Sequence, residues 1–220
     1  MKTFHELQEG VYDPNIFKAI FLAGGPGSGK SYVVRRTTGG LGMKIVNSDD
    51  IYEKMLNDAG LDTTPEDIFS DQGQEIRGKA KAVTKRMQGN FLEGRLGLII
   101  DGTGKDYDKI ATQATQLKQL GYDVHMIFVN TSLDTALARN AKRDRKVPES
   151  LVIKSWNDVQ KNIGKFSQYF RRNFIVVDNN DTDEDVMGPV FKQVMSLAKG
   201  KVQNPTGLKW IANELAMKRR

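Results

Sequence analysis

The amino-acid sequence predicts an α/β fold in which helices sandwich a parallel five-stranded sheet. Two observations predict it. Five short apolar runs, rich in β-branched residues, are each bounded by Gly, Asn or Asp, and longer segments with a helical period separate them. Strands that alternate with helices form βαβ units, and such strands are apolar throughout because helices cover both faces of the sheet. The expected strands span residues 19–23, 44–47, 97–101, 124–130 and 173–178.

The first strand leads into a glycine-rich segment that predicts a phosphate-binding loop. The segment Gly24-Gly25-Pro26-Gly27-Ser28-Gly29-Lys30-Ser31 matches the pattern G-x-x-x-x-G-K-[ST], and a helical pattern follows it. Its glycines let backbone N–H groups converge on phosphate oxygens, and the N-terminus of the next helix adds a favourable dipole. Lys30 can reach the β- and γ-phosphates, and the Ser31 hydroxyl can ligate Mg²⁺. We therefore expect the loop to bind ATP together with Mg²⁺.

The loop alone does not separate a motor, a GTPase and a small-molecule kinase, because all three share it. The chain lacks the guanine-reading pattern N-K-x-D, and the part that follows the loop has about the size of a single kinase domain. Both observations favour a kinase.

Two aspartates follow the second strand. Asp49 and Asp50 stand where the carboxyl end of a strand opens into the crevice that binds ligands in α/β sheets. A kinase needs a carboxylate to orient and deprotonate the attacking hydroxyl of its acceptor. Ser48 and both aspartates are also good N-caps for a helix over residues 51–59. We expect one acid to cap the helix, Asp49 to be the base, and both to face the substrate.

A third aspartate ends the third strand. Asp101 follows a run of apolar residues, and this arrangement commonly holds Mg²⁺ beside a phosphate-binding loop. Residues 102–105 then form an expected turn, in which Thr103 faces the substrate.

Basic residues follow the fourth strand on an expected helix that begins near Ser132. Arg139 and Arg143 are four residues apart and so lie on one face of that helix. Two guanidinium groups on one face can clamp a triphosphate and neutralise the charge that develops in phosphoryl transfer. The helix should end before Pro148. The pattern predicts a mobile lid over about residues 132–150, and the alternative is a solvated basic helix end.

Apolar side chains that recur at a period near 3.6 predict the remaining helices and their buried faces. Gly121 is expected to end the second of these helices. The four stripes are Ile76, Ala80, Val83, Met87 and Phe91; Ile110, Ala114 and Leu117; Val152, Trp156, Val159, Ile163, Phe166 and Phe170; and Val186, Val190, Val194 and Leu197.

Composition excludes several classes of protein. A chain of 220 residues can form a real core. It has no Cys, which rules out disulfides and thiolate chemistry, and its two His, His5 and His125, argue against a zinc site or a Ser-His-Asp site. No apolar run reaches the ~20 residues that span a bilayer, and the N-terminus lacks the apolar region of a secretory signal. We expect no membrane partner.

The net charge of +6 is concentrated in two segments. Residues 139–146 contain five basic residues and one acid, and residues 199–220 contain six basic residues and one acid. The rest of the chain is slightly acidic. A basic patch tells more about a partner than the sequence pI of about 9.4 does. The first patch falls in the expected lid, where ATP alone explains it. Only the second, a basic C-terminal arm over 199–220, points to nucleic acid as a partner.

Four segments together resemble a known family. They are GGPGSGKS at 24–31, NSDD at 47–50, IIDGTG at 99–104 and ALARNAKRDRKVP at 136–148. The set resembles phosphate-loop (P-loop) kinases of the polynucleotide kinase and zeta-toxin group over about residues 17–178. The resemblance implies a mononucleotide-kinase-like sheet, with Lys30 and Ser31 on ATP and Mg²⁺, Asp49 as base, and Arg139 and Arg143 on the phosphates. In one respect the chain differs: such polynucleotide kinases have Arg where Tyr52 stands.

Residues 1–9 (MKTFHELQE), followed by Gly10, resemble the capsid-targeting leaders of head proteins in tailed bacteriophages. Those leaders end in Leu-x-Glu or Ile-x-Glu before a small residue, where a protease cuts. The resemblance implies a phage protein in the cytoplasm of an infected bacterium, or one packaged in the phage head. The alternative is an amphipathic helix that packs through Phe4 and Leu7.

The sequence thus predicts an N-terminal leader or arm over 1–16, a P-loop kinase domain over 17–198, and the C-terminal arm. Three functions remain open. The first is transfer of the γ-phosphate of ATP to a hydroxyl of a nucleic acid or nucleotide, as in polynucleotide 5′-hydroxyl kinases. The second is a zeta-toxin-like kinase of a nucleotide-sugar or another host metabolite, which Tyr52 and the turn after Asp101 favour. The third is a non-catalytic nucleotide-binding protein of a phage head. The oligomeric state is not predicted.

Overall fold

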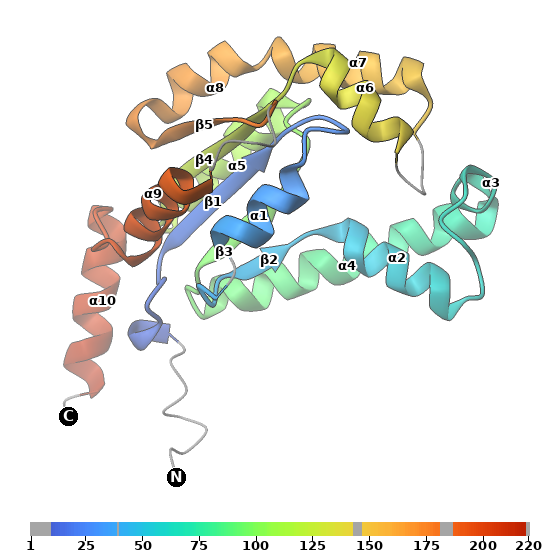
Figure 1. The fold of residues 1–220 in the computed structure, drawn as a ribbon. Helices are drawn as coiled ribbons and strands as arrows, with labels where there is room; N and C mark the ends of the chain where they lie inside the picture. Colours follow the sequence, from blue (N-terminus) through green and yellow to red (C-terminus); the bar gives the residue numbers. More distant parts are fainter. Residues whose placement is uncertain (1–9, 39, 143–146, 181–186, 219–220) are drawn as a thin grey trace.

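Each of the five expected apolar runs forms a strand, and the strands make one parallel sheet (Figure 1). The computed structural model describes residues 10–38, 40–142, 147–180 and 187–218. The strand order is β2-β3-β1-β4-β5, which confirms the predicted fold class. The strands are β1 (Lys18–Ala23), β2 (Lys44–Val46), β3 (Leu98–Asp101), β4 (Asp123–Asn130) and β5 (Phe174–Asp178).

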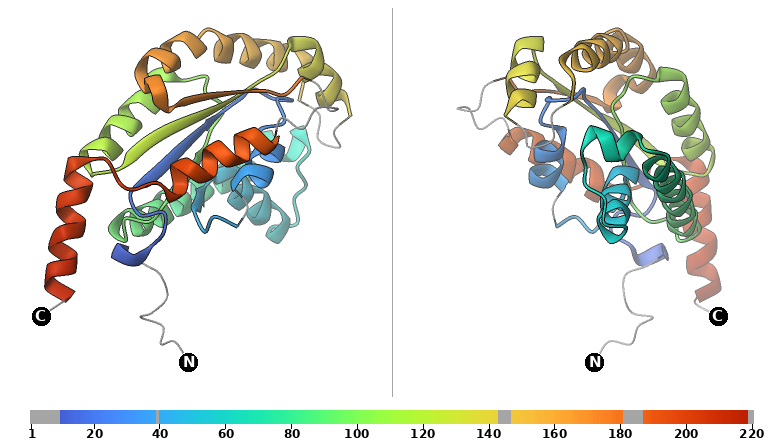
Figure 2. Two further views of the ribbon diagram at one scale, coloured as in Figure 1. Left: turned by 60° about the vertical axis from the view of Figure 1, so that its left-hand side comes forward. Right: turned by 90° about the vertical axis from the view of Figure 1, so that its right-hand side faces the viewer.

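Helices cover both faces of this sheet (Figure 2). Alternate residues of a strand point to opposite faces. Ile20 of β1 therefore packs with α1 (Lys30–Thr38) and α9 (Met187–Lys199), whereas Phe21 packs with α5 (Tyr107–Gln119) and α8 (Ile163–Phe170). Because every residue of β1 is buried, the phosphate-binding loop that follows it is anchored at the centre of the sheet.

A separate group of helices extends from the edge strand β2. It consists of α2 (Ser48–Asp58), α3 (Pro65–Phe69) and the first half of α4 (Asp71–Glu93), which share a small core of their own. In the view of Figure 1, α6 (Leu133–Ala141) and α7 (Glu149–Gln160) lie on the opposite side of the phosphate-binding loop. Short 3₁₀ helices η2 (Gly10–Tyr12) and η3 (Arg171–Asn173) and the C-terminal helix α10 (Pro205–Lys218) complete the chain.

The first apolar stripe is buried only in part. Ile76 and Ala80 belong to the small core, and Phe91 packs on the main core, but Val83 and Met87 are each 40% exposed. The expectation that the whole stripe is buried is therefore wrong. The two ends of α4 belong to different clusters, and Val83 and Met87 lie between these clusters.

The long stripe after Pro148 belongs to two helices, not one. The helix α7 ends at Gln160, and α8 begins at Ile163. Between them, Asn162 donates hydrogen bonds through its side chain to the carbonyls of Gly104 and Lys105, at 3.1 and 2.9 Å. Its position is thus set by a distant turn, which the local period of the sequence does not reveal. Of the last stripe, Val186 lies outside the described residues.

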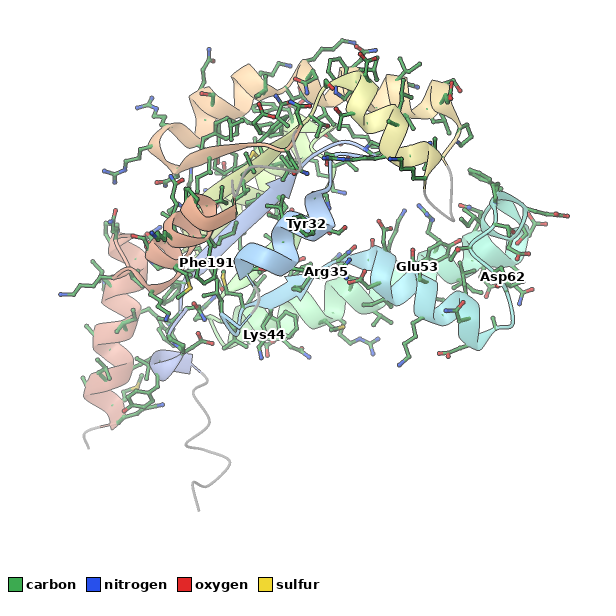
Figure 3. All side chains as sticks on the ribbon, viewed as in Figure 1. Tyr32, Arg35, Lys44, Glu53, Asp62 and Phe191 are labelled. Carbon is green, nitrogen blue, oxygen red and sulfur yellow. The ribbon has the colours of Figure 1, made fainter. Side chains whose placement is uncertain are left out.

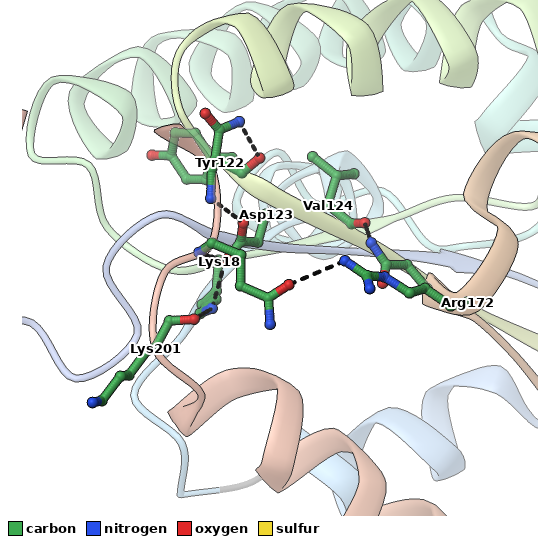
Figure 4. A network of polar contacts seen from close by, with 9 residues as sticks. Lys18, Tyr122, Asp123, Val124, Arg172 and Lys201 are labelled. Atoms are coloured by element: carbon green, nitrogen blue, oxygen red, sulfur yellow. Dashed lines mark hydrogen bonds and ion pairs between the residues drawn. The ribbon is translucent and has the colours of Figure 1, made fainter. Parts of the chain in front are cut away.

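The basic C-terminal segment is anchored to the body of the protein (Figure 4). The carboxylate of Asp123 forms an ion pair with Lys18 at 2.7 Å and accepts hydrogen bonds from the backbone N–H groups of Gln203 and Asn204, each at 2.9 Å. Trp210 of α10 then packs edge-on against Phe17, with 5.4 Å between the ring centroids. The predicted arm therefore contains a fourteen-residue helix that rests on the amino-terminal end of the sheet.

None of the described helices is both long enough and apolar enough to cross a membrane. The predicted leader over residues 1–9 lies outside the described residues.

Candidate active site

The phosphate-binding loop connects β1 to α1, and Lys30 is the first residue of that helix. Gly27 and Gly29 have φ angles of 78° and 77°, a conformation that costs any residue with a Cβ about 1–2 kcal/mol. A Cβ on Gly27 would lie 2.3 Å from the carbonyl oxygen of Ala136 in α6, and a Cβ on Gly29 would lie 2.3 Å from the amide nitrogen of Asn179. At Gly27 both conformation and the rigid backbone of α6 require glycine, whereas at Gly29 the side chain of Asn179 could move and conformation is the main requirement.

Residues from distant parts of the chain hold this loop in place. The side chain of Asn179, which follows β5, donates a hydrogen bond to the carbonyl of Ser28 at 2.8 Å. Trp156 of α7 donates to the carbonyl of Thr131 at 2.9 Å, and the backbone of α7 passes close to Gly25. Sequence reasoning missed Asn179 and Trp156 as supports of the loop. A polar residue directly after the last strand was the one signal that pointed to Asn179.

A chain of polar contacts runs from the loop to the ends of β3 and β2. Lys30, the first residue after the loop, forms an ion pair with Asp101, and the two side chains are only 15% and 14% exposed. The second oxygen of Asp101 accepts a hydrogen bond from the amide of Asn47 at 3.2 Å. The same amide nitrogen lies 3.2 Å from an oxygen of Asp50. The structure therefore brings together Lys30, Asp101 and Asp50, which the sequence placed at three separate strand ends.

Asn47 caps α2, so the expectation that Asp49 or Asp50 is the cap is wrong. The side-chain oxygen of Asn47 accepts a hydrogen bond from the N–H of Asp49 at 2.8 Å, and both aspartates lie in the first turn of the helix. Asn47 has extended backbone geometry directly before the helix, as an N-cap requires.

The two aspartates differ in their surroundings. Partial burial and the nearby carboxylates of Asp101 and Asp49 raise the pKa of Asp50, and they outweigh the opposite effect of Lys30 and Arg35. Figure 3 shows Arg35 on α1, where this helix faces the start of α2. Both aspartates are exposed residues, but the carboxylate of Asp49, unlike that of Asp50, accepts no hydrogen bond from a described residue. Asp50 is thus the member of the pair that is coupled to Lys30 and Asp101.

The turn after β3 adjoins the start of the phosphate-binding loop. The carbonyl of Thr103 accepts a hydrogen bond from the N–H of Gly24 at 2.9 Å, while the Thr103 side chain is exposed. Ser31 is exposed on the first turn of α1. Both hydroxyl groups therefore remain accessible to a bound molecule.

Arg139 reaches the phosphate-binding loop from the last turn of α6. Its Nη1 is buried without a hydrogen-bond partner among the described residues and lies 3.5 Å from the point where a Cβ on Gly29 would be. An unpaired buried guanidinium nitrogen is costly, and a phosphate oxygen would satisfy it. Arg143, the second expected arginine, lies outside the described residues.

Within the expected lid, Asn140 holds the end of α6 to the residues before α7. Its buried side chain donates to the carbonyl of Val147 at 2.7 Å and accepts from the N–H of the same residue at 3.1 Å. This double contact joins α6 to the residues before α7. It sets the position of the neighbouring Arg139.

A groove of about 1150 Å³ opens beside these residues, between α4 and α5. Ser48, Asp101 and Thr103 lie at its end near the loop, and Lys81 and Lys85 of α4 line one wall. Phe21, Val46 and Ile100 of the sheet also line it. The groove combines an apolar floor with polar walls, as is common in pockets for small molecules.

The residues of the site fit a magnesium ion that nucleotide phosphates help to coordinate. They fit less well a metal ion whose ligands all come from the protein. Within the described residues, no three His, Cys, Asp or Glu side chains gather closely enough to hold a metal ion. Ser31, in the first turn of α1, and Asp101, at the end of β3, are the residues that would offer oxygen ligands to such an ion. Mg²⁺ typically takes one or two protein ligands and completes its octahedron with phosphate oxygens and water.

Two comparisons of the sequence show which proteins this chain is similar to. The family model described as Zeta toxin matches residues 8–186. The cytidylate kinase of Methanothrix thermoacetophila is 26% identical over 167 residues, which are 74% of this chain and 81% of that enzyme.

Two solved structures share the fold at low identity. A chain of the AvrRxo1-ORF1:-ORF2 complex with ATP is similar with a TM-score of 0.61 at 16% identity, over 76% of this chain and 56% of that chain. A chain of the Pnkp1/Rnl/Hen1 RNA repair complex is similar with a TM-score of 0.54 at 20% identity, over 69% of this chain and 47% of that chain. The present chain thus spans only about half of these two matched chains.

Proposed function

Because the chain belongs to the zeta toxin family, we propose that it is a phosphotransferase that moves the γ-phosphate of ATP to a hydroxyl group of a small acceptor. The observation that carries the proposal is the contact chain Lys30–Asp101–Asn47–Asp50 at the end of the phosphate-binding loop. A protein that only bound a nucleotide would need the loop. It would not need a carboxylate of raised pKa beside the lysine.

Each group in this cluster has a role that its position supports. Lys30 can exchange Asp101 for the phosphate oxygens of ATP, and Arg139 offers a buried, unpaired N–H to the same phosphates. Mg²⁺ held by Ser31 and Asp101 would supply a charge that neutralises the transferred phosphoryl group. These groups hold ATP in line with an acceptor near Ser48 and Thr103. In such reactions, catalysis is mostly positioning and electrostatic stabilisation.

We assign the role of general base to Asp50 rather than to Asp49. Asp50 shares the Asn47 amide with Asp101, so its carboxylate lies at the reacting end of the loop. A raised pKa makes a carboxylate a stronger base for the proton of the acceptor hydroxyl. Asp49 remains the alternative, because it lies in the same helical turn.

The acceptor we favour is a nucleotide or a nucleotide-sugar. Membership of the zeta toxin family and the relative named cytidylate kinase both support a small acceptor. A polynucleotide end is the second candidate, and the basic segment 199–220 is the observation that favours it. Residence in an infected bacterial cell or in a phage head follows only from the resemblance of residues 1–9 to a capsid leader.

Transfer of label from γ-³²P-ATP tests the function. We expect the wild-type chain to label one class among nucleotides, UDP-sugars and 5′-hydroxyl oligonucleotides. Asp50→Asn should lower this transfer by about 10²–10⁴-fold, because it removes the base. Binding of ATP, measured separately, should change little. Asp49→Asn is the matched control, since it removes the same charge one residue away, and it should retain most of the activity.

Two outcomes would change the assignment. If Asp49→Asn abolishes transfer and Asp50→Asn does not, then Asp49 is the base. If ATP binds and no acceptor is labelled, the chain is a nucleotide-binding protein without this activity.

A further inference from the structure

Arg77 of α4 stacks on the ring of Tyr52 in α2. The guanidinium carbon lies 4.7 Å from the ring centroid, within the range of a cation–π interaction. Tyr52 is 2% exposed, and its hydroxyl is buried without a hydrogen-bond partner among the described residues. Because the hydroxyl has no hydrogen-bond partner there, a phenyl ring would give Arg77 the same stacking surface. What Tyr52 supplies is a flat platform that fixes the direction of the arginine.

The charge of Arg77 has no anionic partner in the described part of the protein. Its Nε is buried and donates no hydrogen bond to a described residue, and no ion pair joins Arg77 to a described carboxylate. Two positions further along the same helix, Lys79 forms a solvent-exposed ion pair with Glu75 at 2.7 Å. A half-buried cation without a counter-charge costs free energy, and an anionic ligand would recover it.

Arg77 begins a line of cations that leads into the groove between α4 and α5. Arg77, Lys81 and Lys85 are four residues apart, so they lie on one face of α4. Lys81 and Lys85 line the groove wall. Ser48, which lines the end of the groove near the loop, lies one helical turn before Tyr52. The stacked arginine is thus one turn from the groove on both α2 and α4.

The charges of the groove are distributed unevenly. The charged residues on the wall formed by α4 are both cations, Lys81 and Lys85. Asp101, Asp106 and Asp108 lie on the side of β3 and α5, next to Lys105 and Lys109. An acceptor with both an anionic and an apolar part matches this arrangement. Its anionic part would follow α4, its apolar part would cover the floor of the groove, and its hydroxyl would reach the acidic end.

We propose that Arg77, held on Tyr52, forms with Lys81 and Lys85 a binding subsite for the phosphate groups of the acceptor. This subsite rests on the proposed function, because it takes the groove as the acceptor site. Its chemistry is recognition of a phosphate-bearing nucleoside. The source of that phosphate is either a nucleotide metabolite or the end of a nucleic acid, and both present the same phosphate group to these three cations.

Calorimetric titration of the full chain tests the subsite directly. The probes are UDP-glucose, a 5′-hydroxyl hexanucleotide and, as the uncharged counterpart, uridine. Arg77→Gln should raise the Kd of the phosphate-bearing probe that the wild type binds by tenfold or more, and should leave uridine unchanged. Arg77→Lys should have an intermediate effect, since it keeps the charge and loses the planar stack. Tyr52→Phe should bind like the wild type.

Lys79→Gln is the matched control. It removes one positive charge from the same helix, but that charge is exposed and already paired with Glu75. Its Kd values should stay within twofold of the wild type. Thermal unfolding of each variant shows whether weaker binding results from unfolding of the protein. Arg77→Lys serves as the second variant if Arg77→Gln unfolds.

Each result bears on the proposal. Tight binding of UDP-glucose identifies a metabolite as the source of the phosphate, and tight binding of the hexanucleotide identifies a nucleic-acid end. The proposal is overturned if the wild type binds neither, or if Arg77→Gln binds both as the wild type does. Transfer of phosphate to a neutral acceptor alone would support the proposed kinase activity and reject the phosphate-binding subsite. Arg77-dependent binding without transfer would support the subsite and reject the kinase activity.

Discussion

Gly27 and Gly40 have the same φ angle of 78°, yet their surroundings differ. A Cβ on Gly27 would collide with the backbone of Ala136 in α6, whereas a Cβ on Gly40 would meet nothing within 4 Å. Substitutions at these two glycines therefore separate two costs. One is the cost of a left-handed backbone conformation, and the other is the cost of a steric clash between the loop and α6.

We predict that Gly27→Ala prevents ATP binding, because the loop and α6 must move apart to admit the methyl group. Gly40→Ala should bind ATP normally and lose only about 1–2 kcal/mol of stability. Urea unfolding and titration with ATP measure the two effects. Equal ATP affinity in both variants would show that the contact between Gly27 and α6 is not needed to form the site.

At the scale of elements, the ion pair of Lys18 and Asp123 joins β1 and β4 to the segment before α10. Lys18 is 4% exposed, and besides Asp123 its ammonium group donates to the carbonyl of Lys201 at 3.1 Å. Asp123 has three donors: the Lys18 ammonium and the N–H groups of Gln203 and Asn204. The two partners are therefore not equivalent: without the other, the carboxylate keeps two hydrogen-bond donors, whereas the ammonium group keeps one acceptor.

We predict that Asp123→Asn destabilises the protein by about 3–5 kcal/mol, because it leaves a buried ammonium group without its counter-charge. Lys18→Met should cost less, since two backbone N–H groups still bind the carboxylate. Urea unfolding gives both free energies, and limited proteolysis shows whether α10 detaches. A smaller loss for Asp123→Asn than for Lys18→Met would contradict this account.

The elements also show where sequence patterns are sufficient. The strands follow from patterns that each displays by itself, and the structure has them within a residue or two of the expected bounds. The helix α5 likewise ends close to Gly121, as its stripe predicts. The exposed middle of α4 and the break at Asn162 were not predictable in this way. Both depend on what lies beside the helix: open space in the first instance and the turn after β3 in the second.

At the scale of the whole molecule, His125 links stability to pH. Burial lowers the pKa of His125 to about 4, with a further contribution from the charge of Lys18, and Asp123 opposes the shift. The unfolded chain binds this proton near pH 6.5, and the folded protein binds it only near pH 4. The stabilisation is therefore complete above pH 6.5 and is lost as the pH falls toward 4.

We predict that the free energy of unfolding falls by up to about 3 kcal/mol between pH 6.5 and pH 4 on account of this one group. His125→Leu should remove that part of the pH dependence, whatever its effect on stability at pH 7. Urea unfolding of both proteins at pH 7, 5.5 and 4.5 measures the difference in slope. Parallel curves for the two proteins would show that His125 is not the group responsible.

The strand pattern, the phosphate-binding loop and the acids at the strand ends could all be predicted from the sequence. These features depend on residues that are neighbours in the chain, where the period of apolar side chains and the spacing of a motif are directly visible. The folded structure was needed to show that Asn47 caps α2 and joins Asp50 to Asp101, that Asn179 supports the loop, and that Arg77 stacks on Tyr52. Some of these contacts join residues that are distant in sequence, and others are made by one of several neighbouring residues that could each make them. In both situations the packing of the elements decides which contact forms.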